Sequence, residues 1–282
     1  MLFDTFRKSY DAPLKAVDLS VELLAAAEQY AAFESPDDAV WSAYSKEARA
    51  IVGSLKLLGS QQVHPVILSG LAKLDVAEMQ KLLKLLEVCI VRFLLIVGGN
   101  PGRFEPACAK LAEAIYKGAV HTAAAAFAEL KSSGVYPSDA EFESAFRLKS
   151  ERNSQKARYF LRAIEREAQF KAKGKLANEM EPAQLTLEHI LPKKPGSDWK
   201  AVTLADKELA EDCTHRLGNM CLLTTINKEL GQKSFAKKKL VYGKSQLMTT
   251  KDLASVSDWN RGAIELRQST MGQFAKAIWR FK

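Results

Sequence analysis

The stretch that decides the fold of this chain reads LEHILP at residues 187–192, HRLGNMCLLTTIN at 215–227 and SFAKKKLVY at 234–242. Residues 185–190 are typical of a β-strand, and Pro192 ends the strand because proline lacks the N–H that a strand ladder needs. Residues 220–223 form a second apolar run that is short enough for a strand. Ser234 is a favourable N-cap residue, so we expect a helix from it to Tyr242. The expected order is strand, connection, strand and helix, a ββα unit.

Residues 1–178 carry a series of helical patterns without visible chemistry. Ser138 and Glu141 have the spacing of a capping box, which predicts the start of a helix. Other helices are expected over residues 14–33, 36–58, 76–97, 104–117, 120–130 and 157–170, with one or two more over 259–279. We therefore expect a mainly α protein, with an all-helical scaffold domain over residues 1–178. The ββα unit and its flanking helices would form a second domain over residues 179–282.

The composition is that of an ordinary globular protein, since 47% of the 282 residues are hydrophobic and 26% are charged. The net charge of +8 permits nucleic acid or an anionic membrane as a partner but selects neither. The four cysteines lack the paired spacing of a zinc site, so we expect no zinc and free thiols in a reducing cytoplasm. Charged residues interrupt both the N-terminus and the apolar run at 82–97, which argues against a signal peptide and a membrane span.

Glu188, His189 and Asn227 are the residue types that a one-metal phosphodiester hydrolase needs. A neutral histidine can deprotonate water near neutral pH, so His189 is the candidate general base. Carboxylate and amide oxygens suit Mg²⁺, so Glu188 and Asn227 are the candidate metal ligands. Adjacent residues on a regular strand point to opposite faces. We therefore expect the strand to end or twist where Glu188 and His189 meet.

The sequences EHILP, LGNMCLL and SFAKKKLVY, with Asn227 between the last two, resemble the C-terminal HNH (His-Me finger) nuclease domain of GmrSD-type restriction endonucleases. That domain also occurs in the related SspE phage-defence nuclease. The resemblance extends to YFLRAIERE before these motifs and to a pattern of Trp259, Ile264, Arg267 and Trp279 after them. It covers the chain from about residue 148 to the end and is weaker over the earlier helices.

The resemblance implies a DNA endonuclease with Mg²⁺ or Mn²⁺ as its cofactor and double-stranded DNA as its substrate. It places the general base on His189 and the metal ligands on Glu188 and Asn227, and it makes Asn219 the residue that braces the loop carrying the histidine. It further implies nicking of foreign DNA in a bacterial cytoplasm. The early helices resemble a region that joins such a nuclease to a nucleotide-binding sensor domain, and we expect that domain as a partner outside this chain.

Basic residues near these motifs are weaker candidates for binding phosphate. Six lysines lie between residues 228 and 244, where a run of charge usually marks a solvated helix face. Among them Lys238 and Lys233 are the candidates for DNA contacts, and His215 is a candidate for an accessory phosphate contact. His64 and His121 are expected to be structural. The alternative to an enzyme is a non-catalytic module of a defence complex that binds DNA or a partner protein.

Overall fold

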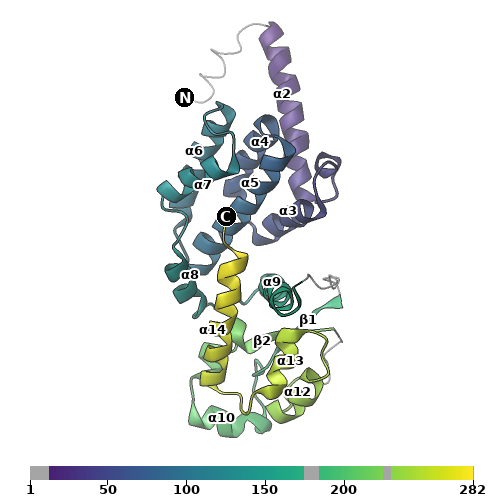
Figure 1. Ribbon diagram of the computed structural model, residues 1–282, viewed down its shortest axis with the longest axis vertical. Coiled ribbons are helices and arrows are strands. Elements are labelled where there is room, and N and C mark those ends of the chain that lie inside the picture. The colour runs from purple at the N-terminus through teal and green to yellow at the C-terminus, as the bar shows by residue number, and fades with distance from the viewer. Residues whose placement is uncertain (1–12, 175–183, 225–229, 282) are drawn as a thin grey trace. The chain divides into compact units, whose positions relative to one another are not determined.

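The computed structural model describes residues 13–174, 184–224 and 230–281 (Figure 1). The chain divides into two compact units. The first unit contains Met1–Ile90, Gly99–Tyr136 and Phe281, and the second contains Val91–Gly98 and Pro137–Arg280. The domain boundary expected after residue 178 thus lies inside the second unit, because α9 (Ser154–Lys173) packs against both strands of that unit.

The described part of the first unit consists of helices and the segments that connect them. The helices are α2 (Pro13–Ala31), α3 (Lys46–Leu58), α4 (His64–Lys73), α5 (Val76–Cys89), α6 (Pro101–Tyr116) and α7 (Ala123–Ser132), with short 3-10 turns at Ala32–Glu34, Ala39–Trp41 and Gln61–Val63. The pair α4 and α6 packs closely, and α5 contacts α3, α4 and α7. Among the described residues, no helix is both long and apolar enough to cross a lipid bilayer.

Two expected helices of the early chain have different bounds in the structure. The helix expected over residues 36–58 begins only at Lys46, because the Ser45 side chain accepts the N–H of Ala48 and caps it there. The helix expected over residues 76–97 is α-helical to Cys89 and π-helical over Ile90–Ile96. Hydrophobic periodicity does not distinguish these two helical forms.

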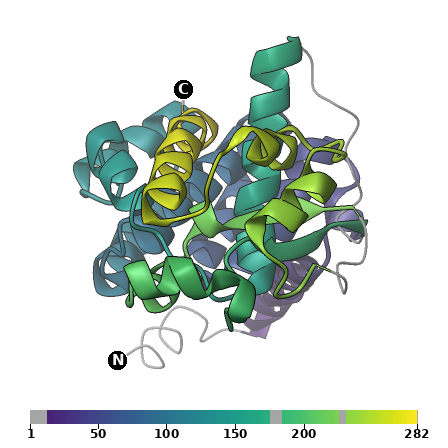
Figure 2. The same cartoon turned by 90° about the horizontal axis from the view of Figure 1, so that it is seen from below.

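The second unit continues with α8 (Asp139–Phe146) and α9, followed by β1 (Thr186–His189), α10 (Lys200–Ala205) and α11 (Leu209–Cys213). The chain then forms a 3-10 turn at Leu217–Asn219, β2 (Met220–Leu223), α12 (Phe235–Tyr242), α13 (Met248–Lys251) and α14 (Arg261–Ile278). The strands β1 and β2 pair antiparallel, and they cross α9 in the view of Figure 2. β1, β2 and α12 follow one another in the expected order.

A hydrophobic core supports the strands and α12. Two buried tryptophans, Trp199 and Trp259, lie within it, and Phe235 at the start of α12 packs against the Trp259 ring. The other members of this core are Ile190, Leu191, Leu209, Cys213, Cys221, Leu223, Leu230, Tyr242, Leu253 and Ile264. The residues that immediately follow His189 are therefore buried on the apolar side of the unit.

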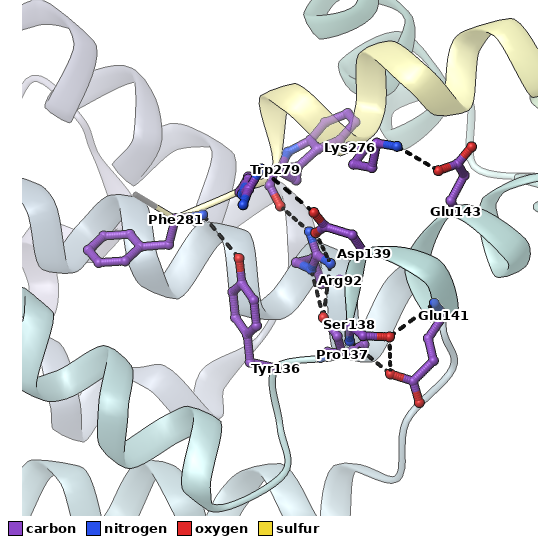
Figure 3. Close-up of polar contacts among 11 residues, drawn as sticks. Arg92, Tyr136, Pro137, Ser138, Asp139, Glu141, Glu143, Lys276, Trp279 and Phe281 are labelled. Atoms are coloured by element: carbon purple, nitrogen blue, oxygen red, sulfur yellow. Dashed lines mark hydrogen bonds and ion pairs between the residues drawn. The ribbon is translucent and has the colours of Figure 1, made fainter.

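A fully buried arginine ties together three segments of the second unit (Figure 3). Arg92, in the π-helical segment, donates to the carbonyls of Pro137 and Trp279 and forms an ion pair of 2.8 Å with Asp139. Its guanidinium also lies 4.7 Å from the centre of the Phe142 ring. A buried charge is tolerated only when partners replace its hydration, and these contacts supply them. Arg92 therefore fixes the end of α14 against the start of α8.

Candidate functional site

The strand pair places Glu188 opposite Cys221 and His189 opposite Met220. Glu188 is buried, with 8% of its surface exposed, and His189 is half-buried. Pairing continues past the end of β1, since the Ile190 N–H donates to the Asn219 carbonyl at 2.9 Å. The two candidate residues are neighbours at the end of a strand whose continuation is held in place.

Lys238 on α12 binds the end of β1 from the inside of the unit. Its Nζ lies 2.7 Å from Glu188 Oε1, 2.9 Å from the His189 carbonyl and 3.0 Å from the Ile190 carbonyl. The side chain is completely buried, and a lysine ammonium has three donors. All three therefore go to protein oxygens. The structure thus gives Lys238 protein partners in place of the DNA phosphate that the sequence assigned to it.

His189 is held in its neutral form. Burial is the main cause that lowers the pKa of its imidazole to about 4, and Lys193, His215 and Lys238 contribute to the same shift. Its Nε2 atom is buried and has no hydrogen-bond partner in the part of the chain that the structure describes. An imidazole that is neutral at working pH and has an unused ring nitrogen is able to accept a proton from water.

Asn219 fixes the segment that follows His189. Its Oδ1 accepts the N–H of Leu191 at 2.8 Å and the indole N–H of Trp259 at 2.9 Å. Its Nδ2 donates to the carbonyls of Leu191 at 3.0 Å and Thr214 at 3.1 Å. Because the amide is fully buried and its two donors and both acceptor positions are used, its orientation is determined. These are the contacts of a bracing residue.

The turn that carries Asn219 is held against α14. A side chain at Gly218 would bring its Cβ within 2.4 Å of the Ile264 carbonyl, so this close approach requires glycine. Gln268 accepts the Gly218 N–H at 3.0 Å and donates to the carbonyls of Phe146 and Lys149. Arg267 donates to the Gly218 and Met220 carbonyls, each at 2.7 Å. The sequence offered no signal for Gln268, since its partners are 50 residues or more away along the chain.

His215 lies directly beside His189. The two rings meet edge to face with their centres 5.7 Å apart. The backbone of His215 is held by Glu151, whose N–H donates to its carbonyl at 2.8 Å. Burial lowers the pKa of His215, and the charges of Lys193 and Arg152 add to the effect. Its Nδ1 is buried and has no hydrogen-bond partner among the described residues.

The remaining candidates contribute less to this geometry. Asn227 lies outside the described residues. The Lys233 side chain is exposed, and its backbone carbonyl accepts the indole N–H of Trp199 at 3.1 Å. Of its neighbours on α12, Lys237 pairs with Asp198 at 3.2 Å and Lys239 lies over the Phe235 ring. Three of the six lysines of this segment, Lys237, Lys238 and Lys239, thus have partners within the protein.

The described residues contain no group of three or more histidine, cysteine, aspartate or glutamate side chains placed to hold a metal ion. Glu188 is the one described carboxylate that the sequence assigned to a metal. A carboxylate oxygen is a hard ligand of the kind that Mg²⁺ takes one or two at a time, with water and substrate oxygens completing its coordination. Glu188 is one ligand of this kind beside His189, with its Oε1 bound to Lys238 Nζ at 2.7 Å.

Residues 136–274 match the family model described as GmrSD restriction endonucleases, C-terminal domain. This range contains both strands, α12 and each described residue of the site. No curated protein matches the chain. The match supports a GmrSD-type restriction endonuclease C-terminal region over these residues.

Proposed function

We propose that the second unit is a Mg²⁺-dependent HNH (His-Me finger) DNA endonuclease that nicks foreign DNA in a bacterial anti-phage restriction system. The observation that carries the proposal is the neutral His189 imidazole, with a buried unpartnered Nε2, beside the carboxylate of Glu188 at the end of β1. The family match over the same residues supports DNA as the substrate. A nucleotide-binding sensor is the partner that this function calls for.

In the proposed reaction, His189 accepts a proton from the water that attacks the phosphodiester. Because its pKa lies below the neutral range, the imidazole is unprotonated there and has a ring nitrogen with a free lone pair. Glu188 and Asn227 would hold the metal. When bound, Mg²⁺ would supply positive charge to the phosphate and to the leaving 3′-oxygen.

Two residues serve as positioning residues in this proposal. Asn219 fixes Leu191 on one side of the turn and Thr214 on the other, so the segment after His189 cannot rotate freely. Lys238 binds the Glu188 carboxylate together with the carbonyls of His189 and Ile190. Both contacts hold the base and the metal ligand in one arrangement before DNA binds, which reduces the cost of organising the transition state.

The test is incubation of supercoiled plasmid with Mg²⁺, and separately with Mn²⁺, using the wild type, His189→Ala and the control His121→Ala. His121 is exposed and belongs to the first unit. We expect open-circular product from the wild type and the control, and a loss of about 100-fold or more in His189→Ala. Equal nicking by His189→Ala would refute the assignment. Plasmid binding without cleavage, unchanged in Glu188→Gln, would support a non-catalytic binding module instead.

A further inference from the structure

The surroundings of His189 and His215 carry positive charge from a part of the chain remote from the lysine-rich helix. Lys193 lies four residues beyond His189, on the segment that Asn219 fixes at Leu191. Arg152 follows Glu151, whose N–H binds the His215 carbonyl. Both side chains are exposed to solvent. Two cations therefore flank the histidine pair from two different segments.

These segments are held in place by the backbone. Residues 149–151 run antiparallel to 215–217, with a bridge between Ser150 and Arg216 and a hydrogen bond of 3.3 Å from the Leu217 N–H to the Lys149 carbonyl. The guanidinium of Arg216 also donates to the Arg147 carbonyl at 2.9 Å. The position of Arg152 relative to His215 is thus set by several contacts.

The charges that act on His215 are positive. Burial is the first cause that lowers the pKa of this ring, and the charges of Lys193 and Arg152 also lower it. Lys238 is already paired with Glu188, whereas Lys193 and Arg152 have no such buried partner to neutralise them in the described residues. Two exposed cations on segments held beside this histidine pair attract an anion.

We propose that Lys193, Arg152 and His215 form a binding site for a backbone phosphate of DNA beside His189. The proposal rests on the proposed nuclease function and identifies which residues of this site bind the strand. Lys193 and Arg152 supply charge from two separate segments, and the His215 ring lies edge to face with that of His189, with the ring centres 5.7 Å apart. The bound phosphate is held next to the imidazole that activates water.

The proposed phosphate site does not use the lysine-rich segment that the sequence makes most conspicuous. The lysines at 237–239 of α12 are engaged by Asp198, by Glu188 and by the Phe235 ring, whereas Lys193 and Arg152 lie on two other segments of the chain. An arginine can bind a phosphate through two N–H groups, and a lysine acts as a point charge. This pair therefore contributes both orientation and attraction.

The test measures DNA binding without cleavage. A fluorescein-labelled duplex is titrated with protein in EDTA, and anisotropy is followed over a series of NaCl concentrations. The variants are Lys193→Gln, Arg152→Gln, the double variant and His215→Gln, with Lys237→Gln as the matched control. Lys237 is an exposed lysine whose partner is Asp198. Thermal melts of each variant establish that it is folded.

We expect the double variant to bind at least about 10-fold more weakly and its log–log salt slope to fall by about 1, as for the loss of one phosphate contact. His215→Gln should weaken binding without changing the slope, since the ring is neutral. In a parallel titration, inorganic phosphate is added as a competitor of the labelled duplex. If phosphate displaces the duplex only at concentrations far above that of the duplex, DNA is identified as the ligand. Inorganic phosphate that competes as strongly as the duplex would overturn DNA as the ligand.

An unchanged affinity and slope in the double variant would overturn the proposed site. Weakened binding in Lys237→Gln equal to that in the double variant would do so as well. The plasmid nicking assay of the wild type distinguishes a failure of the phosphate site from a failure of the nuclease assignment. If the wild type nicks plasmid and the double variant binds normally, the nuclease assignment stands and the phosphate site fails.

Discussion

The substitution Lys238→Met tests how the end of β1 is held. The Nζ of Lys238 is fully buried, and it binds Glu188 Oε1 at 2.7 Å and the carbonyls of His189 and Ile190 at 2.9 and 3.0 Å. Methionine has a similar volume but no charge or donor, so it leaves the Glu188 carboxylate buried beside two unpaired carbonyls. Breaking a buried ion pair from one side costs about 3–5 kcal/mol. We expect the free energy of unfolding to fall by about this amount.

The assay is equilibrium unfolding in urea followed by tryptophan fluorescence. Three of the four tryptophans, Trp199, Trp259 and Trp279, belong to the second unit, so the signal reports mainly on that unit. Lys237→Met is the matched control on the same helix, because its ion pair with Asp198 is exposed and should matter much less. The double variant with Glu188→Met should recover part of the loss, since it removes the buried carboxylate together with its ammonium partner. Equal stability of Lys238→Met and Lys237→Met would refute the reasoning.

Three further predictions follow from the same contacts. Asn219→Ala removes four buried hydrogen bonds, each of which contributes about 0.5–1.5 kcal/mol. The free energy of unfolding, measured by urea titration, should therefore fall by about 2–6 kcal/mol. A fall of less than about 1 kcal/mol would contradict the bracing role. NMR titration of the metal-free protein should give His189 a midpoint near pH 4 and His64 a midpoint below 6.5. Because the folded pKa of His189 lies below its ordinary value, the contribution of this residue to stability is present above pH 6.5 and is lost as the pH falls toward 4. A midpoint of 6.5 for His189 would contradict its burial. Arg92→Met should cost about 3–5 kcal/mol in a thermal or urea melt and Asp139→Asn clearly less, because Asp139 is 38% exposed; the reverse order would be inconsistent with the buried network.

Local signals in the sequence predicted several helix ends. Ser138 and Glu141 form the predicted capping box, Gly59 ends α3 in the left-handed conformation, and Ser234 caps α12 by accepting the N–H of Lys237. Each of these interactions joins residues that are at most four apart, so residue types and spacing suffice to predict it. The mainly helical fold is confirmed on the same basis.

Contacts between distant segments could not be predicted in the same way. The ion pair of Lys238 with Glu188 spans 50 residues, and the sequence indicated Lys238 as a candidate for DNA contacts without indicating this partner. The flanking of His215 by Arg152 depends on backbone pairing between residues 149–151 and 215–217, for which the sequence carries no pattern. Gly218 was visible as part of LGN, but the reason for it, a close approach to α14, appears only in three dimensions.

The starting point of α3 shows how two local signals compete. The sequence predicted a helix that starts at residue 36, yet Asp38 caps a single 3-10 turn at Ala39–Trp41 and the α-helix begins after Ser45. Trp41 is buried, with its indole N–H donating to the Ala32 carbonyl at 2.9 Å. This tertiary contact favours the short turn over a continuous helix.

Chemical rescue of a His189 variant tests the central claim most directly. His189→Gly removes the imidazole, and free imidazole added to the Mg²⁺ reaction can take over its role as the base that deprotonates water. The account predicts that nicking of supercoiled plasmid is lost in His189→Gly and rises with imidazole concentration, while the wild type does not respond. Nicking by His189→Gly at the wild-type rate without imidazole would contradict the account.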